Sequence, residues 1–239
     1  MRKTESKTLA EVGLPILVNF FIFFLSFLGF FLSCLFAKRD GYSHWLTRLL
    51  YFTQLSNLWI GITSLVFAVM LLRGRATERQ RRTVSAFKYI FTVSITVTGL
   101  IFCSVLAPFA DFNVWTFASI VTHVAVPLLS VFDFFTDRQI ARIDKGAVPL
   151  TLIPPFLYFV FAGILCLLRV DFGRGDPYPY FFMDFYSEVG LFGFIAKWPP
   201  KIGSFYWFVF FLILLYLLGV SYRGIHARLS RKREGTQAP

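Results

Sequence analysis

Six apolar runs, each close to the length of a membrane-spanning helix, dominate this chain of 239 residues. A helix that crosses a hydrocarbon core of about 30 Å needs roughly 20 predominantly apolar residues. Because backbone groups in lipid must be hydrogen-bonded within their own segment, each run is expected to be an α-helix. The sequence therefore predicts an all-α fold, a polytopic membrane protein with six transmembrane helices in one bundle. The runs cover residues 14–36, 51–73, 87–107, 115–135, 148–168 and 204–222.

The composition agrees with a membrane environment. Hydrophobic residues make up 56% of the chain and include 32 phenylalanines, whereas a soluble domain is usually about 45–50% apolar. The net charge of +11 could indicate nucleic-acid binding, but the basic residues lie in short clusters between the apolar runs. Such clusters orient membrane segments, so no nucleic-acid partner is expected. The first apolar run ends without a small-residue cleavage site, which argues against a signal peptide.

The three cysteines, Cys34, Cys103 and Cys166, all lie inside apolar runs and form no CxxC pair. They are interpreted as packing residues, so neither a zinc site, a disulfide framework nor a cofactor is predicted.

The distribution of lysine and arginine predicts the orientation. Seventeen of the 24 basic residues fall at the two ends and in the links after the second and fourth runs. The other three links hold seven. Positive charge accumulates on the cytoplasmic side, so both termini are predicted to be cytoplasmic.

Residues 1–222 are expected to form a single domain, and the basic tail 223–239 is expected to lack regular structure. The outer link 169–203 is aromatic and marked by prolines. Tyrosine and tryptophan favour the membrane interface, so this link is predicted to form a lid or a re-entrant cap.

The second run carries polar residues at helical spacing. Thr53 and Asn57 are one turn apart on one face, and Ser56 flanks them. Small and polar residues at such spacing commonly serve helix–helix packing. A functional cluster is the alternative interpretation.

The fourth run contains His123, the only histidine inside a predicted span, on a face shared with Thr116, Ser119 and Ser130. Pro127 lies four residues later and lacks the N–H that would bond to the His123 carbonyl, so a kink is expected there. An ionisable residue within the membrane is a functional-site hypothesis by default. The alternative is a neutral histidine bonded to a neighbouring helix.

These residues suggest a specific chemistry. A histidine base can activate the hydroxyl of Thr53 for acyl transfer, and Asn57 can donate to the developing oxyanion. Thr53 and His123 lie at about the same depth in the membrane if the second helix begins at His44, with Ser43 as its N-cap after a turn at Asp40–Gly41. Ser56, Ser119 and Tyr178 are further candidates for substrate contacts.

Asp133 lies ten residues after His123, or roughly 15 Å along a helix. It is therefore too distant to orient the imidazole, and a basic partner near the inner surface is expected.

Three short segments resemble a known family. YFTQLSNLW in the second run, VTHVAVPLLSVFDFF in the fourth and DPYPYFFMDF in the outer link look like segments of the androgen-induced and androgen-dependent (ADTRP) membrane proteins and of related bacterial six-span proteins. The resemblance implies an intramembrane threonine hydrolase that cleaves fatty-acyl esters. Thr53 would be its nucleophile and His123 its base, and Tyr178 and Pro179 would match an element of unassigned role. It also implies a bacterial inner membrane.

Two other functions remain open from the sequence. The protein can be a transporter that binds a lipid or small solute, with His123 and Asn57 lining its cavity, or a scaffold in which every polar residue serves packing. The expected partner is a membrane lipid or a lipid ester.

Overall fold

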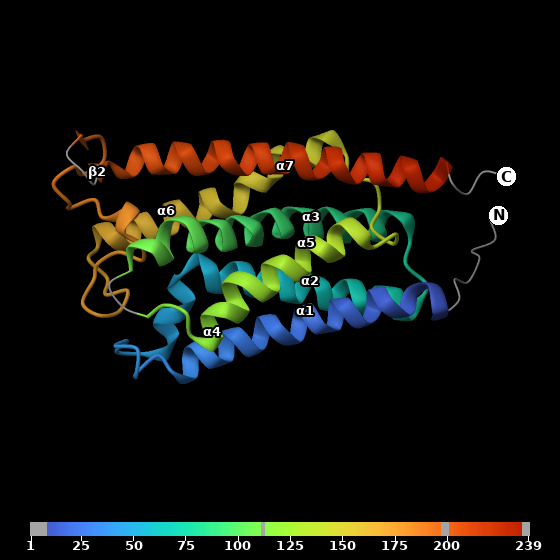
Figure 1. Cartoon of the computed structure of the whole chain (residues 1–239), viewed down its shortest axis with the longest axis horizontal. Helices are drawn as coiled ribbons and strands as arrows, with labels where there is room; N and C mark the ends of the chain where they lie inside the picture. The colour runs from blue at the N-terminus through green and yellow to red at the C-terminus, as the bar shows by residue number, and fades with distance from the viewer. Residues whose placement is uncertain (1–8, 111–112, 197–200, 236–239) are drawn as a thin grey trace.

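The computed structural model describes residues 9–110, 113–196 and 201–235, and within them six helical segments are long and apolar enough to cross a membrane. They lie side by side in one elongated bundle (Figure 1). The all-α, multi-pass fold predicted from the apolar runs is therefore confirmed. Arg2, Lys3, Lys7 and Lys197, which entered the orientation argument, lie outside the described residues.

The spans are built from helices of very different regularity. The first, second and sixth are the continuous helices α1 (Leu9–Leu35), α2 (Phe52–Arg73) and α7 (Ser204–Gly235). The third joins α3 (Glu78–Ile101) to the π-helical turn η2 (Phe102–Leu106). The fifth joins the short turns η5 (Lys145–Ala147) and η6 (Pro149–Leu152) to α6 (Ile153–Leu167).

The fourth span is broken where proline predicts a break. It consists of α4 (Phe117–Ile120), a π-helical turn η4 (Val121–Ala125) and α5 (Val126–Thr136). Thr116 caps the span by accepting a hydrogen bond from the Ser119 N–H. The π-helical turn ends just before Pro127, whose missing N–H makes a regular α-helical ladder impossible at this point.

The two ends of the bundle differ in character. The start of α1 and the end of α7 lie at one end, here called the terminal end (Figure 1). The opposite end, here called the loop end, carries the 3₁₀ helix η1 (Trp45–Leu50), the 3₁₀ turn η3 (Ala107–Phe109) and the long connection between α6 and α7. That connection contains the 3₁₀ turn η7 (Phe181–Met183) and a two-stranded antiparallel ribbon, β1 (Phe194–Ile195) with β2 (Lys201–Ile202).

Close helix contacts occur at small residues. A Cβ on Gly99 of α3 would lie 2.8 Å from the carbonyl oxygen of His123, and one on Gly61 of α2 would lie 2.8 Å from the Cβ of Ser26 in α1. The backbones approach this closely because these positions lack side chains, as expected for helices that pack in lipid. Gly61 and Gly99 therefore serve helix packing.

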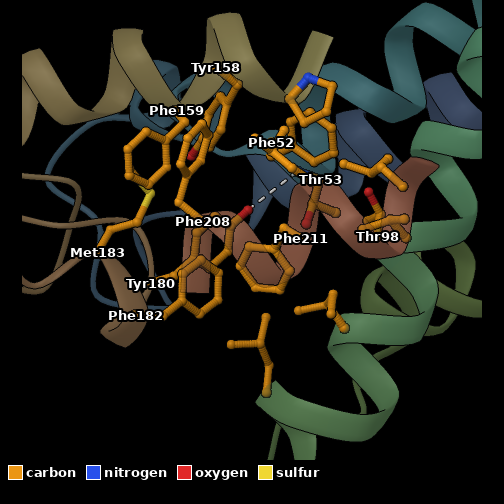
Figure 2. Close-up of a pocket in the computed structure, with 16 residues that line it drawn as sticks. Phe52, Thr53, Thr98, Tyr158, Phe159, Tyr180, Phe182, Met183, Phe208 and Phe211 are labelled. Atoms are coloured by element: carbon orange, nitrogen blue, oxygen red, sulfur yellow. Dashed lines mark hydrogen bonds between the residues drawn. The ribbon is translucent and has the colours of Figure 1, made fainter. Parts of the chain in front are cut away.

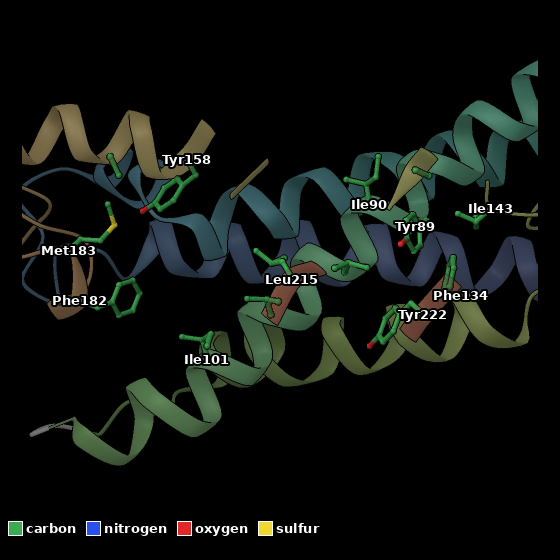
Figure 3. Packing of buried hydrophobic residues seen from close by; sticks show 14 of the residues in the cluster. Tyr89, Ile90, Ile101, Phe134, Ile143, Tyr158, Phe182, Met183, Leu215 and Tyr222 are labelled. Atoms are coloured by element: carbon green, nitrogen blue, oxygen red, sulfur yellow. The ribbon is translucent and has the colours of Figure 1, made fainter. Parts of the chain in front are cut away.

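Buried aromatic and aliphatic side chains form the core along the full length of the bundle (Figure 3). At the loop end, Phe182 and Met183 from the long connection pack into this core beside Tyr158 of α6. The connection is thus partly inserted among the helices at this end.

Three details differ from expectation. His44, not Ser43, caps the short helix η1 by accepting from the Leu46 N–H, and this helix is separated from α2 at Tyr51. The third span begins at Glu78 because Thr77 and Gln80 form a capping box, so Lys88 lies within the span. The tail expected to lack structure from residue 223 continues α7 to Gly235, which places His226 in a helix and buries it.

Candidate functional site

Thr53 lines a narrow apolar cavity at the loop end. It lies in the first turn of α2 with only 7% of its surface exposed. The cavity is about 80 Å³ and is bounded by α3, α6, α7 and the inserted connection. Its lining is mostly aromatic and aliphatic, with the hydroxyls of Thr53, Thr98, Tyr158 and Tyr180 as the polar groups (Figure 2). Such a lining suits an apolar chain that carries one polar, reacting group.

Tyr180 supplies a contact that the sequence did not suggest. The first N–H groups of a helix have no partner within the helix, and Tyr51 at the N-cap of α2 provides no side-chain hydrogen bond. The Thr53 N–H instead donates to the Tyr180 hydroxyl over 3.4 Å (Figure 2). Burial raises the pKa of Tyr180, and hydrogen bonding with Thr53 and Tyr158 partly offsets this rise. The phenol therefore stays neutral and keeps a proton that it can donate.

His123 lines a second, polar cavity at the same end. This cavity is about 470 Å³. Its wall combines side chains of the fourth span with charged groups from the links around residues 39–48 and from Arg174. Arg48 pairs with Asp40 at 2.7 Å, and Arg174 donates to the Asp40 carbonyl oxygen at 2.9 Å. The cavity can therefore hold water and polar groups.

The orientation of the His123 ring determines which nitrogen is basic. Its Nδ1 lies 3.0 Å from the carbonyl oxygen of Ser119 and 3.1 Å from the hydroxyl of Thr122. A carbonyl oxygen can only accept, so Nδ1 carries the proton of the neutral ring and Nε2 holds the lone pair. The ring also stacks on Phe102 with a centroid separation of 3.8 Å.

Thr53 and His123 line two different cavities at the loop end, and no hydrogen bond joins them among the described residues. Asn57 links the first turn of α2 to Thr122, the residue before His123, because its amide donates both to the Thr53 carbonyl at 2.8 Å and to the Thr122 carbonyl at 3.1 Å. The first turn of α2 contributes Thr53 to the apolar cavity and Gln54 to the polar one. Neighbouring residues of α2 thus line two different cavities.

These contacts change the expected roles of the flanking residues. Both amide hydrogens of Asn57 are used in holding α2 to the fourth span, so Asn57 is a positioning group and not an available oxyanion donor. Ser56 is fully buried and bonds to the Thr53 carbonyl at 3.0 Å and to the Thr98 hydroxyl at 2.9 Å. It therefore serves helix packing and does not line either cavity.

Of the other two predicted substrate contacts, Ser119 lines a cavity and Tyr178 does not line the Thr53 cavity. Ser119 lines the polar cavity and orients His123 through its carbonyl. Tyr178 packs against the hydrophobic core and does not line the Thr53 cavity, where Tyr180 lies instead. The missed residue is separated from Thr53 by 127 positions, and its sequence neighbours gave no sign of which tyrosine points inward.

The basic partner expected for Asp133 is Lys88 of α3, and Asn19 of α1 contacts both of them. This group lies in the half of the bundle nearer the terminal end, away from Thr53 and His123.

Within the described residues, no group of three or more histidine, cysteine, aspartate or glutamate side chains could hold a metal ion. Comparisons with protein-family models, curated proteins and solved structures gave no match to this chain.

Proposed function

We propose that this protein is a membrane-embedded hydrolase that cleaves a fatty-acyl ester, with Thr53 as nucleophile and His123 as base. The observation that carries the proposal is that the first turn of α2 contributes Thr53 to the apolar cavity and Gln54 to the polar cavity that His123 lines. Thr53 lines an apolar cavity suited to an acyl chain, and His123 lines a polar cavity that can admit water.

The reaction would follow the usual course of acyl transfer. The Thr53 oxygen attacks the ester carbonyl while its proton passes to Nε2 of His123. The ester C–O bond then breaks, the alcohol leaves with that proton, and a water molecule activated by His123 hydrolyses the acyl-threonine. The neutral phenol of Tyr180 would donate a hydrogen bond to the oxyanion.

This chemistry requires a proton path between Thr53 and His123, which line different cavities. The imidazole must leave its stack on Phe102, or one water molecule must relay the proton from Thr53. Catalytic hydrogen bonds commonly form only when substrate is bound. A cavity of about 80 Å³ holds only the first few carbons of an acyl chain, so short-chain esters are the first substrates to screen.

The decisive experiment is labelling of the purified protein with a fluorophosphonate probe, which reacts with activated hydroxyl nucleophiles. We expect labelling of the wild type and its loss in Thr53→Ala and in His123→Ala. Thr63→Ala is the matched control, because Thr63 is equally buried in α2 but lines neither cavity. Labelling that persists in Thr53→Ala would exclude Thr53 as the nucleophile.

A second candidate function is lipid binding or transport without chemistry. The absence of a direct Thr53–His123 hydrogen bond among the described residues favours it. A carrier should keep its lipid affinity in Thr53→Ala and show no labelling in the wild type, so the same experiment separates the two candidates.

We also propose that the terminal end faces the cytoplasm of a bacterium and that the loop end faces outward across the inner membrane. The arginine-rich links at the terminal end support this orientation. Lys88 lies within the third span and not in a link, but the remaining basic residues still favour the terminal end. Fusion of alkaline phosphatase to the carboxyl terminus should give an inactive enzyme, whereas a green fluorescent protein fusion should fluoresce.

A further inference from the structure

A third cavity, of about 700 Å³, lies at the terminal end. It is distinct from the two cavities that carry the proposed function. The beginning of α3, the segment 137–142 and the last turns of α7 form its wall. Two carboxylates, Glu78 and Asp137, line it together with six arginines, so positive charge is in clear excess. The arginines are Arg81, Arg82, Arg138, Arg142, Arg231 and Arg233.

Hydrogen bonds to the main chain hold two of these arginines in place. Arg81 Nε donates to the Gln139 carbonyl at 2.8 Å, and Arg233 donates to the Phe135 carbonyl at 2.7 Å. A guanidinium group has five N–H donors, so each of these bonds fixes the side chain while leaving further donors. Glu78 is paired with Arg82 at 2.8 Å, which reduces its repulsion of an anion.

Apolar side chains are exposed on the helices that lead to this cavity. Phe132 of α5 is 57% exposed and Ile225 of α7 is 43% exposed, as expected for side chains that face hydrocarbon. Arg231 follows Ile225 by six positions within α7, or about 9 Å along the helix, and Arg138 lies two residues beyond the end of α5 at Thr136. The arginines therefore begin where the apolar surface ends.

We propose that this cavity binds the phosphate group of an anionic phospholipid such as phosphatidylglycerol. Arginine forms paired, charge-assisted hydrogen bonds with phosphate oxygens, and basic pockets between transmembrane helices recognise acidic headgroups. A free phosphate ester offers the same oxygens but no acyl chains. The adjoining apolar surface favours the lipid. The proposal does not depend on the hydrolase activity.

Native mass spectrometry from an uncharged detergent tests the proposal. The full-length protein is titrated with phosphatidylglycerol, phosphatidylcholine and sn-glycerol 3-phosphate in separate series. We expect phosphatidylglycerol to bind at least about tenfold more tightly than either of the others, because bonds to charged groups are the strong ones. Equal binding of the two lipids, or tighter binding of glycerol 3-phosphate, would overturn the assignment.

Two triple variants separate the cavity from general surface charge. Arg138→Gln/Arg142→Gln/Arg231→Gln removes three charges from the cavity and should weaken phosphatidylglycerol binding about tenfold or more. Arg75→Gln/Arg79→Gln/Arg228→Gln removes three exposed arginines outside the cavity and should leave binding within about twofold of the wild type, since exposed charges contribute little. Equal losses in the two variants would refute a specific site.

Discussion

Lys88 of α3 and Asp133 of α5 form an ion pair that is almost completely enclosed, with 1% and 2% of their side chains exposed. Asn19 of α1 contacts both partners, so three helices meet at this pair. Removing two such charges from water costs desolvation free energy, and their mutual attraction offsets this cost only while both charges are present. The pair therefore acts as a constraint on how these three helices assemble.

Removing one partner of this pair should be more harmful than removing both. We expect Asp133→Leu or Lys88→Met alone to lower the free energy of unfolding by about 3–5 kcal/mol, because each leaves an unpaired buried charge. The double variant should recover much of that loss. Thermal unfolding in detergent measures the effect, and additive losses in the double variant would contradict it.

Gly99→Ala should disturb the contact between the third and fourth spans. The added methyl group would lie 2.8 Å from the carbonyl oxygen of His123 and 3.2 Å from the ring of Pro127. Neither neighbour can move easily, because one is backbone and the other is part of a proline, so we expect a loss of about 1–3 kcal/mol. Gly146→Ala is a suitable control, since nothing lies within 4 Å of the corresponding position.

Tyr180→Phe should remove the hydrogen bond that the Thr53 N–H donates. Loss of a helix cap costs about 0.5–2 kcal/mol, so we expect a small decrease in the unfolding temperature together with slower fluorophosphonate labelling. Tyr178→Phe is the matched control two residues away, and it should change neither quantity. Unchanged labelling of Tyr180→Phe would show that its hydroxyl does not contribute to the reaction.

The pH dependence of stability should report on Asp137, which lies just beyond the fourth span. Burial, followed by repulsion from Asp133, raises the pKa of Asp137 to about 6, against attraction from Lys88 and Arg81. The folded protein thus holds this proton to higher pH than the unfolded chain does. Stability should decrease as the pH rises from about 4 through about 6, by up to about 3 kcal/mol.

Asp137→Asn isolates this contribution, because the amide retains an oxygen that can accept from the Gln139 N–H as Asp137 does at 2.7 Å. The stability difference between wild type and variant, measured by thermal unfolding from pH 4 to pH 8, should change with pH in the direction given above. A difference that is constant across this range would show that Asp137 titrates normally.

Hydropathy and proline placement determined much of the fold from the sequence. Lipid leaves the backbone no alternative to helices for runs of this length, so the six spans were predicted within a few residues, apart from the start of the third span and the end of the sixth. The break before Pro127 also follows from local covalent chemistry. The helical extension of α7 was missed because its charged, exposed residues give no apolar signal.

Only the tertiary structure decided which polar residues meet. The sequence placed Thr53, Asn57 and His123 on their helices, but helix rotation and packing put Thr53 and His123 in different cavities. They also used both amide hydrogens of Asn57 in bridging α2 to the fourth span. The same packing brought Tyr180 to Thr53 and Lys88 to Asp133. Such contacts join residues far apart in the chain, and periodicity within one segment carries no information about its partner.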